Sequence, residues 1–193
     1  FAAGTIPFPS FDRFRSITDK ARVVEEARRV GVKAPEQVIL PDSGAIGVGL
    51  AQKLDFPVVL KPARSVGGTA SRRREVGVVH VRSSSELEGT IGGLPSQAFP
   101  LLVQEKIEGT GAGVFLLTWK GRLVAHFSHR RIREKPPSGG VSVFRESVRA
   151  SPTLLDRSVA LLERFGWDGI AMVEYKIAET TGEPYIMEVN PRL

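Results

Sequence analysis

Apolar and polar residues alternate with two different periods along the chain, and these periods predict a mixture of helices and strands. In residues 152–165 apolar side chains recur every three or four positions. This is the pattern of a helix with one buried face, and Ser151 is a suitable N-cap for it. Another helix is predicted over residues 18–30, with Thr18 or Asp19 as its N-cap.

Short apolar runs bounded by Gly, Pro, Asp or Asn predict strands. The predicted strands are residues 36–40, 58–61, 77–81, 101–103, 114–118, 123–127, 170–177 and 185–189. Further helices are predicted at residues 43–54 and 86–91, whereas residues 1–16 show no period and are expected to be an extended lead-in.

The most informative pattern lies near the C-terminus, where the last two predicted strands flank a turn-forming segment, residues 179–184. This arrangement predicts a β-hairpin. Glu174 and Glu188 are equally distant from Thr181, so a hairpin centred there places them opposite each other. Side chains alternate between the faces of a strand, so Asn190 shares the face of Glu188.

Two carboxylates opposite each other destabilise a sheet, and a carboxylate in an apolar strand carries a desolvation cost. The pattern therefore favours a positive charge between Glu174 and Glu188. With the amide oxygen of Asn190 they form a set of hard ligands that suits Mg²⁺. The chain has no Cys and only three scattered His, which argues against a zinc-type site. The alternative is a half-exposed hairpin whose glutamates point to solvent.

Two lysines lie where they could meet an anion. Lys20 falls in the first turn of a predicted helix, against the positive end of the helix dipole. Lys61 ends a predicted strand and is followed by a loop with Gly67 and Gly68, whose small residues let backbone N–H groups approach phosphate. The loop is no Walker motif, because no GKS or GKT opens a helix. The alternatives are an ordinary exposed lysine and a flexible hairpin loop.

The densest cationic segment is residues 129–133, which precede a loop rich in Pro and Gly, residues 136–140. Arg130, Arg131 and Arg133 suit phosphate or a substrate carboxylate. A nucleic-acid-binding surface is the alternative, although the nearby aromatic residues give no obvious stacking platform.

Composition narrows these possibilities. A chain of 193 residues with 41% hydrophobic residues can bury a core and form one or two domains. It contains no long apolar run and no signal peptide, so it is expected to be soluble and cytoplasmic, without a membrane partner. A net charge of +6 suits a polyanion, either a nucleic acid or a nucleoside triphosphate. The chain begins without Met and ends inside a motif, so we expect a fragment with missing flanking domains.

The order of these features resembles the ATP-grasp superfamily of carboxylate–amine ligases. The features, in chain order, are Lys20, Lys61 with its Gly-rich loop, residues 104–109, Glu174, and the segment EVNPR at residues 188–192. The branch that contains biotin carboxylase, D-alanine–D-alanine ligase and the carbamoyl-phosphate synthase large chain is the most similar. The resemblance implies an α+β ATP-grasp fold, in which two α+β lobes with antiparallel sheets clamp ATP between them.

The resemblance also implies roles for individual residues. The residues implied for ATP are Lys20 and Lys61 at the phosphates, Ser65, Gly67, Gly68 and Thr69 in the mobile loop, Glu105, Lys106 and Ile107 at the adenine, and Glu108 at the ribose. The implied ligands of Mg²⁺, or Mn²⁺, are Glu174, Glu188 and Asn190. Arg192 and Lys61 are the implied catalytic residues, and the implied substrate-binding residues are Arg130, Arg131, Arg133, Gly139 and Gly140.

The expected organisation has residues 1–17 as a linker remnant, residues 18–103 as the first lobe and residues 104–193 as the second. The expected function is an ATP- and Mg²⁺-dependent ligase core that activates a small carboxylate as an acylphosphate for attack by an amine. Two alternatives stay open: a non-catalytic nucleotide-binding module and a basic nucleic-acid-binding domain.

Overall fold

The computed structural model describes residues 9–45, 54–63, 78–135 and 140–192. Contacts divide the chain into two units. Unit 1 comprises Phe1–Ala34 and Glu108–Leu193, and unit 2 comprises Pro35–Ile107. This division differs from the predicted lobes, because the helices before residue 34 join the C-terminal part and residues 104–107 stay with the preceding part.

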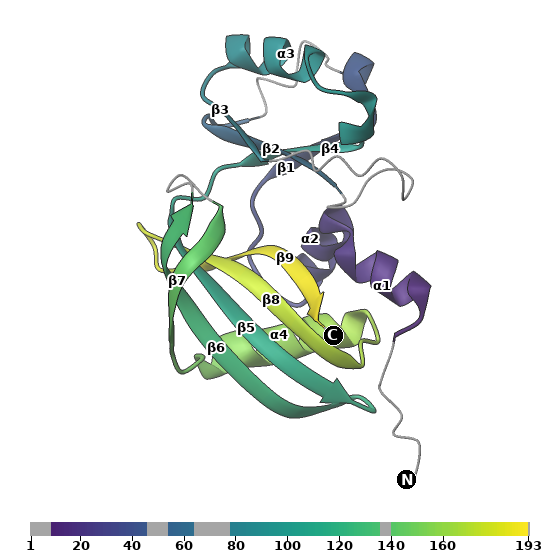
Figure 1. Cartoon of the computed structure of the whole chain (residues 1–193), viewed down its shortest axis with the longest axis vertical. Coiled ribbons are helices and arrows are strands. Elements are labelled where there is room, and N and C mark those ends of the chain that lie inside the picture. The colour runs from purple at the N-terminus through teal and green to yellow at the C-terminus, as the bar shows by residue number, and fades with distance from the viewer. Residues whose placement is uncertain (1–8, 46–53, 64–77, 136–139, 193) are drawn as a thin grey trace. The chain divides into compact units, whose positions relative to one another are not determined.

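Unit 1 is built on a five-stranded antiparallel sheet with the strand order β7-β6-β5-β8-β9 (Figure 1). The strands are β5 (Gly109–Trp119), β6 (Arg122–Lys135), β7 (Val141–Ser147), β8 (Gly169–Ala178) and β9 (Pro184–Arg192). The helices are α1 (Phe11–Thr18), α2 (Lys20–Arg29) and α4 (Pro152–Arg164). The predicted hairpin near the C-terminus is confirmed as β8 and β9, and the predicted amphipathic helix as α4.

One face of this sheet carries the core of unit 1. Buried side chains of the three helices pack there against alternate residues of β5, β8 and β9. Ser151 caps α4 by accepting the Leu154 N–H at 3.2 Å. Further along α4, Ser158 Oγ lies 2.8 Å from the buried Tyr175 hydroxyl. Since side chains alternate along a strand, the opposite face of the same strands carries Glu174 and Glu188.

The N-terminal segment differs from its prediction. Residues 1–16 were expected to be extended, but helix α1 begins inside this range at Phe11 and continues to Thr18. Ser10 caps it by accepting the Arg13 N–H at 3.4 Å. The helix begins at Phe11, two residues after Pro9 and so beyond the helix-breaking prolines, and buries Ile17 fully. Burial of one side of this segment therefore stabilises a helix, although the sequence shows no regular helical pattern there.

Unit 2 is a four-stranded antiparallel sheet with the order β1-β4-β2-β3. Its strands are β1 (Gln37–Leu40), β2 (Val58–Pro62), β3 (Val79–Val81) and β4 (Leu101–Glu105), and its helix is α3 (Ser84–Gly92). Leu87 and Ile91 of α3 pack with Val58 and Leu60 of the sheet in a separate core. Of the predicted helix 43–54, the described part is a short 3₁₀ turn, Ser43–Ala45. Within the described parts of the chain, no helix combines the length and apolar character needed to cross a membrane.

Candidate functional site

The β8–β9 hairpin sets the register of the acidic pair. Glu174 pairs with Glu188 across the two strands, as the sequence predicts. The register shifts by one residue directly after Glu174, which adds a bulge beside the pair. On β9, the Asn190 amide donates to Glu188 Oε1 at 2.9 Å. Both carboxylates and the carboxamide therefore lie together on the face opposite the core.

Two basic side chains supply the positive charge that the acidic pair demands. Lys20, the first residue of α2, places its Nζ 2.9 Å from Glu188 Oε2. Asp19 fixes this helix start by accepting the N–H groups of Ala21 and Arg22. Arg131 of β6 places its Nη2 2.6 Å from Glu174 Oε2. Each glutamate of the pair therefore has a cation against it.

Arg131 joins this cluster because β5 leaves room for it. A Cβ at Gly111 would come within 2.5 Å of Arg131 Cδ and 2.9 Å of Glu134 Oε1. Arg131 also places Nη1 3.1 Å from Glu134 Oε1 and 3.5 Å from the Gly140 carbonyl oxygen. The same face is kept clear at Gly113, where a Cβ would lie 2.7 Å from His129 Cε1. The alternate glycines of the segment GTGAG are thus a sequence signal of the site that the motif analysis missed.

With Glu134, three carboxylates face two cations in this cluster, so negative charge is in excess. Burial raises the pKa of Glu174 above its usual range, and the nearby charge of Glu188 raises it further. Arg131 opposes this shift because its charge lowers the pKa of Glu174, but the net shift is still upward. The donor set of two carboxylates and one amide oxygen therefore suits a hard cation. The described residues contain no group of three His, Cys, Asp or Glu side chains that could hold a metal ion.

His129 lies on the same face and is buried, although the motif analysis gave it no role. Its ring lies 5.6 Å from that of Phe115 and 6.5 Å from that of Phe127, measured between centroids. Burial, together with the charges of Arg145 and Arg131, lowers the pKa of His129. His129 is therefore neutral at pH 7 and adds no charge to the acidic cluster.

The other predicted substrate-binding residues are dispersed. Arg130 forms an ion pair with Glu146 of β7, with Nε 2.7 Å from Oε1. It neighbours Arg131 on β6 and so points to the other face of the sheet. Arg133 is exposed. Gly140 contacts Arg131 through its carbonyl oxygen, and Gly139 lies outside the described residues. Of the predicted set, Arg131 and Gly140 are therefore the residues that the structure brings together.

Arg192 is exposed near the end of β9, where it pairs in register with Ile170. Its position on β9 gives it the same face as Glu188 and Asn190. Glu108 belongs to unit 1, and its carbonyl oxygen accepts the Glu179 N–H at 3.0 Å.

The remaining predicted residues belong to unit 2. Lys61 lies near the end of β2 and is only 8% exposed. Glu105 closes β4 and is tied to Glu36, because its N–H donates to the Glu36 carbonyl at 2.8 Å and its Oε2 accepts the Glu36 N–H at 3.3 Å. The Lys106 N–H donates to the Pro57 carbonyl, and Ile107 is buried. The predicted loop residues Ser65, Gly67, Gly68 and Thr69 lie outside the described residues.

A family model described as "ATP-grasp domain" matches residues 17–193, which is most of the chain. The chain belongs to the ATP-grasp domain family. The two antiparallel sheets agree with this fold, so the expected fold class and resemblance are confirmed.

Individual ATP-grasp relatives support the same assignment. The carbamoyl phosphate synthase large chain of Gemmatimonas aurantiaca is 24% identical over 201 residues, which cover 98% of this chain and 17% of that protein. A biotin carboxylase from Campylobacter jejuni, solved with β-γ-ATP, superposes with a TM-score of 0.75 at 19% identity, over 96% of this chain and 42% of that one. An L-amino acid ligase from Bacillus licheniformis superposes with a TM-score of 0.69 at 17% identity, over 96% and 43%. The chain thus spans less than half of each of these proteins.

Proposed function

We propose that this chain is the ATP-binding core of a ligase that activates a carboxylate with Mg-ATP. The observation that carries the proposal is the cluster of Glu174, Glu188 and Asn190, with Lys20 and Arg131 placed against its carboxylates. The matches to ATP-grasp ligases support the general chemistry. The metal, the acylphosphate and the residue roles are part of the proposal.

Glu174, Glu188 and Asn190 would hold Mg²⁺ or Mn²⁺ through hard oxygen ligands. The ion would neutralise phosphate charge and orient the phosphate oxygens for transfer. With the carboxylates engaged by a metal, the charges of Lys20 and Arg131 would act on phosphate or substrate oxygens instead.

The proposal also gives nucleotide-binding roles to residues of unit 2. Lys61 would neutralise phosphate, with Ser65, Gly67, Gly68 and Thr69 covering it. The Lys106 N–H already donates within the unit, so the adenine edge would be read by the Lys106 carbonyl and the Ile107 main chain next to Glu105. Glu108 of unit 1 would hold the ribose.

The reaction fits this set of charges. A substrate carboxylate oxygen attacks the γ-phosphorus while the bond to the ADP oxygen breaks, which gives an acylphosphate and ADP. An amine then attacks the acyl carbon, phosphate leaves, and the amine loses a proton to solvent. Both reactants of the first step are anions, so catalysis depends on positive charge and positioning, to which Arg192 and Lys61 would contribute. Arg131, which contacts Gly140, is the best-placed residue for the substrate carboxylate, whereas Arg130 and Arg133 lie elsewhere on β6.

Phosphate release from ATP tests the proposal against a module that only binds nucleotide. We expect release to require Mg²⁺ and to rise when a carboxylic acid and an amine are supplied together from a panel of small compounds. Glu188→Gln tests the proposed metal site, since it keeps the side-chain shape and removes the charge. Tight Mg-ATP binding with no release under any pair would favour the binding module. Binding of oligonucleotides that falls steeply with salt and ignores Glu188→Gln would favour a nucleic-acid-binding domain.

A further inference from the structure

An apolar patch lies beside the proposed metal site, on the same face of the sheet of unit 1. It consists of two successive rows of paired residues on β6, β5 and β8: Phe127, Phe115 and Met172, then Ala125, Leu117 and Ile170. Gly113 pairs with Glu174 and precedes Phe115 by two residues. Since side chains alternate along a strand, the patch and Glu174 share a face.

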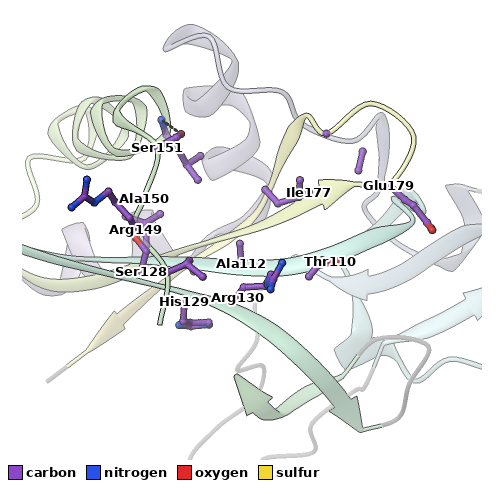
Figure 2. Close-up of a pocket in the computed structure, with 16 residues that line it drawn as sticks. Thr110, Ala112, Ser128, His129, Arg130, Arg149, Ala150, Ser151, Ile177 and Glu179 are labelled. Carbon is purple, nitrogen blue, oxygen red and sulfur yellow. Dashed lines mark hydrogen bonds between the residues drawn. The ribbon is translucent and has the colours of Figure 1, made fainter. Parts of the chain in front are cut away.

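The helix-covered face of the same strands lies across the sheet from the patch. Figure 2 shows Ala112 and Ile177 on that face, whereas the His129 side chain extends to the other side of the sheet. His129 pairs with Gly113 and therefore belongs to the face of the patch. A ligand on the patch would thus be separated from the core of unit 1 by the sheet itself.

The patch is accessible to solvent and carries no charge. Phe127 and Ile170 are 49% and 40% exposed, and Phe115 is half-buried between Phe127 and Met172. The rings of Phe115 and Phe127 are tilted by 47°, with their centroids 5.8 Å apart. A contiguous group of exposed apolar side chains marks an interaction or ligand site. A further ring can pack against this pair at the spacing that aromatic groups prefer.

The row of Gly113 and Glu174 separates the patch from the nucleotide side of this face. Glu108, the residue proposed for the ribose, directly precedes β5, whereas Phe115 and Leu117 follow Gly113 on that strand. In phosphoryl transfer the attacking and leaving oxygens lie roughly in line, on opposite sides of the γ-phosphorus. With ADP toward Glu108 and the phosphate at Glu174, the attacking carboxylate would approach from the side of the patch.

The spacing of the sheet gives the reach that a substrate needs. Residues two apart on a strand are separated by about 7 Å, and neighbouring strands by about 4.8 Å. In such a sheet Phe115 lies about 8 Å from Glu174 and Phe127 about 12 Å. Arg131 places its Nη2 2.6 Å from Glu174 Oε2, so its guanidinium reaches the row of the metal site. A phenyl ring on a two-carbon chain extends about 6–7 Å from its carboxylate carbon, which is enough to lay the ring over Phe115.

We propose that the carboxylate substrate has an apolar body about the size of one phenyl ring and that the patch binds this body. The proposal rests on the proposed function, because the metal site fixes where the phosphate lies. The carboxylate lies beside the Arg131 guanidinium, and the ring covers Phe115 and contacts Phe127. A second carboxylate over Phe127 would lose water without gaining a cation, since Arg192 lies three strands away on β9, about 14 Å by strand spacing. The site therefore discriminates against dicarboxylic acids and against acids as small as acetate.

Titration with 3-phenylpropanoate in the presence of Mg²⁺ and ADP, followed by methyl resonances in NMR spectra, tests the proposal. The methyl groups of Met172 and Ile170 report on the patch, and those of Ala112 and Ile177 report on the other face. We expect saturable shifts at Met172 and Ile170 and none at Ala112 and Ile177. Acetate and adipate should each bind at least about tenfold more weakly than 3-phenylpropanoate, because neither places an apolar ring on the patch.

The variant Phe127→Ala separates the patch from the general binding of carboxylates. It should weaken the binding of 3-phenylpropanoate at least about threefold and leave that of acetate unchanged, because it removes one aromatic contact. Phe144→Ala is the matched control, since Phe144 of β7 is 56% exposed. Arg145 pairs with Arg131 and shares its face, so the adjacent Phe144 points to the other face and Phe144→Ala should bind as the wild type does.

Four results would overturn the proposal. The absence of saturable shifts at Met172 and Ile170, or shifts at Ala112 and Ile177 alone, would show that the patch does not hold the acid. Equal binding of acetate and 3-phenylpropanoate, or equal effects of Phe127→Ala and Phe144→Ala, would show that the patch does not select the substrate. A sedimentation coefficient that rises with protein concentration in the wild type but not in Phe127→Ala would show that the patch joins two copies of the chain.

Phosphate release from ATP distinguishes a failure of this proposal from a failure of the proposed function. If an amine with acetate supports release as well as an amine with 3-phenylpropanoate, the ligase reaction holds and the assignment of its substrate is wrong. If 3-phenylpropanoate binds at the patch but no pair of acid and amine releases phosphate, the patch binds the acid as proposed and the ligase reaction is wrong.

Discussion

Replacing Arg131 by Met gives a direct test of the charge arrangement on the outer sheet face. Methionine keeps an unbranched stem over Gly111 but removes the guanidinium group. That group lies 2.6 Å from Glu174 Oε2 and 3.1 Å from Glu134 Oε1. In Arg131→Met these two carboxylates, with Glu188 beside them, would lack their shared cation.

The burial of the pair sets the expected magnitude. Arg131 and Glu174 side chains are 14% and 15% exposed. Breaking a buried ion pair costs about 3–5 kcal/mol, and an exposed pair contributes about 0–1 kcal/mol. We therefore expect Arg131→Met to lower the free energy of unfolding by about 2–3 kcal/mol at neutral pH. For a chain of this size that corresponds to a fall in Tm of about 4–12 °C.

The loss of stability in Arg131→Met should depend on pH and on divalent cations. Burial and Glu188 already raise the pKa of Glu174 in the native protein. A carboxyl whose pKa is raised on folding destabilises the fold above that pKa, and protonation removes the penalty as pH falls through it. The deficit of Arg131→Met should therefore be full at neutral pH and shrink on acidification. Mg²⁺ or Mn²⁺ should also restore stability, because either ion replaces the lost positive charge.

Thermal and urea unfolding of the wild type and Arg131→Met, with and without Mg²⁺ and at several pH values, measures these effects. Arg133→Met is the matched control, since it removes an exposed arginine from the same strand and should change stability by less than about 0.5 kcal/mol. If the two variants unfold alike at neutral pH, and neither pH nor metal separates them, the interpretation of Arg131 as the counter-charge of Glu174 is wrong.

Three further outcomes follow from individual contacts. Gly111→Ala should destabilise the protein by about 1–3 kcal/mol in urea unfolding, because its Cβ would lie 2.5 Å from Arg131 Cδ; unchanged stability would contradict this packing. Ser158→Ala should cost about 1–3 kcal/mol, since it leaves the buried Tyr175 hydroxyl without its 2.8 Å partner, and a neutral effect would mean that the bond is absent. Burial raises the pKa of Tyr175 to about 12, whereas an unfolded tyrosine titrates near 10, so stability should fall as pH rises through this interval, and less so in Tyr175→Phe.

Local patterns in the sequence were sufficient to predict the hairpin and the start of α2. The pairing of Glu174 with Glu188 follows from two apolar runs and one turn, all within 24 residues. The position of Lys20 follows from the cap at Asp19. Both features depend on short-range periodicity and turn chemistry, which a single sequence contains.

Features that depend on pairing between distant strands were not predicted. Gly109, Gly111 and Gly113 weaken the strand signal of β5, and the arginines of β6 were assigned to a cationic segment before a loop and not to a strand. In the structure β5 pairs with β6 over more residues than the predicted strands 114–118 and 123–127 contain. This pairing brings Arg131 of β6 to Glu174 of β8 across Gly111 of β5. The contact joins three strands and could not be found from motifs, which suggested phosphate, a substrate carboxylate or a nucleic acid as the partner of these arginines.

Calorimetric titration with ATP, with and without Mg²⁺, tests the central claim most directly. The wild type, Glu188→Gln and Lys61→Ala are compared, after unfolding curves confirm that each variant is folded. We predict saturable binding in the wild type that needs Mg²⁺, with affinity reduced at least about tenfold in each variant, as expected when a charged contact to a nucleotide is lost. Binding that is indifferent to Mg²⁺ and to Glu188→Gln would contradict the assignment of Glu174, Glu188 and Asn190 as the metal site.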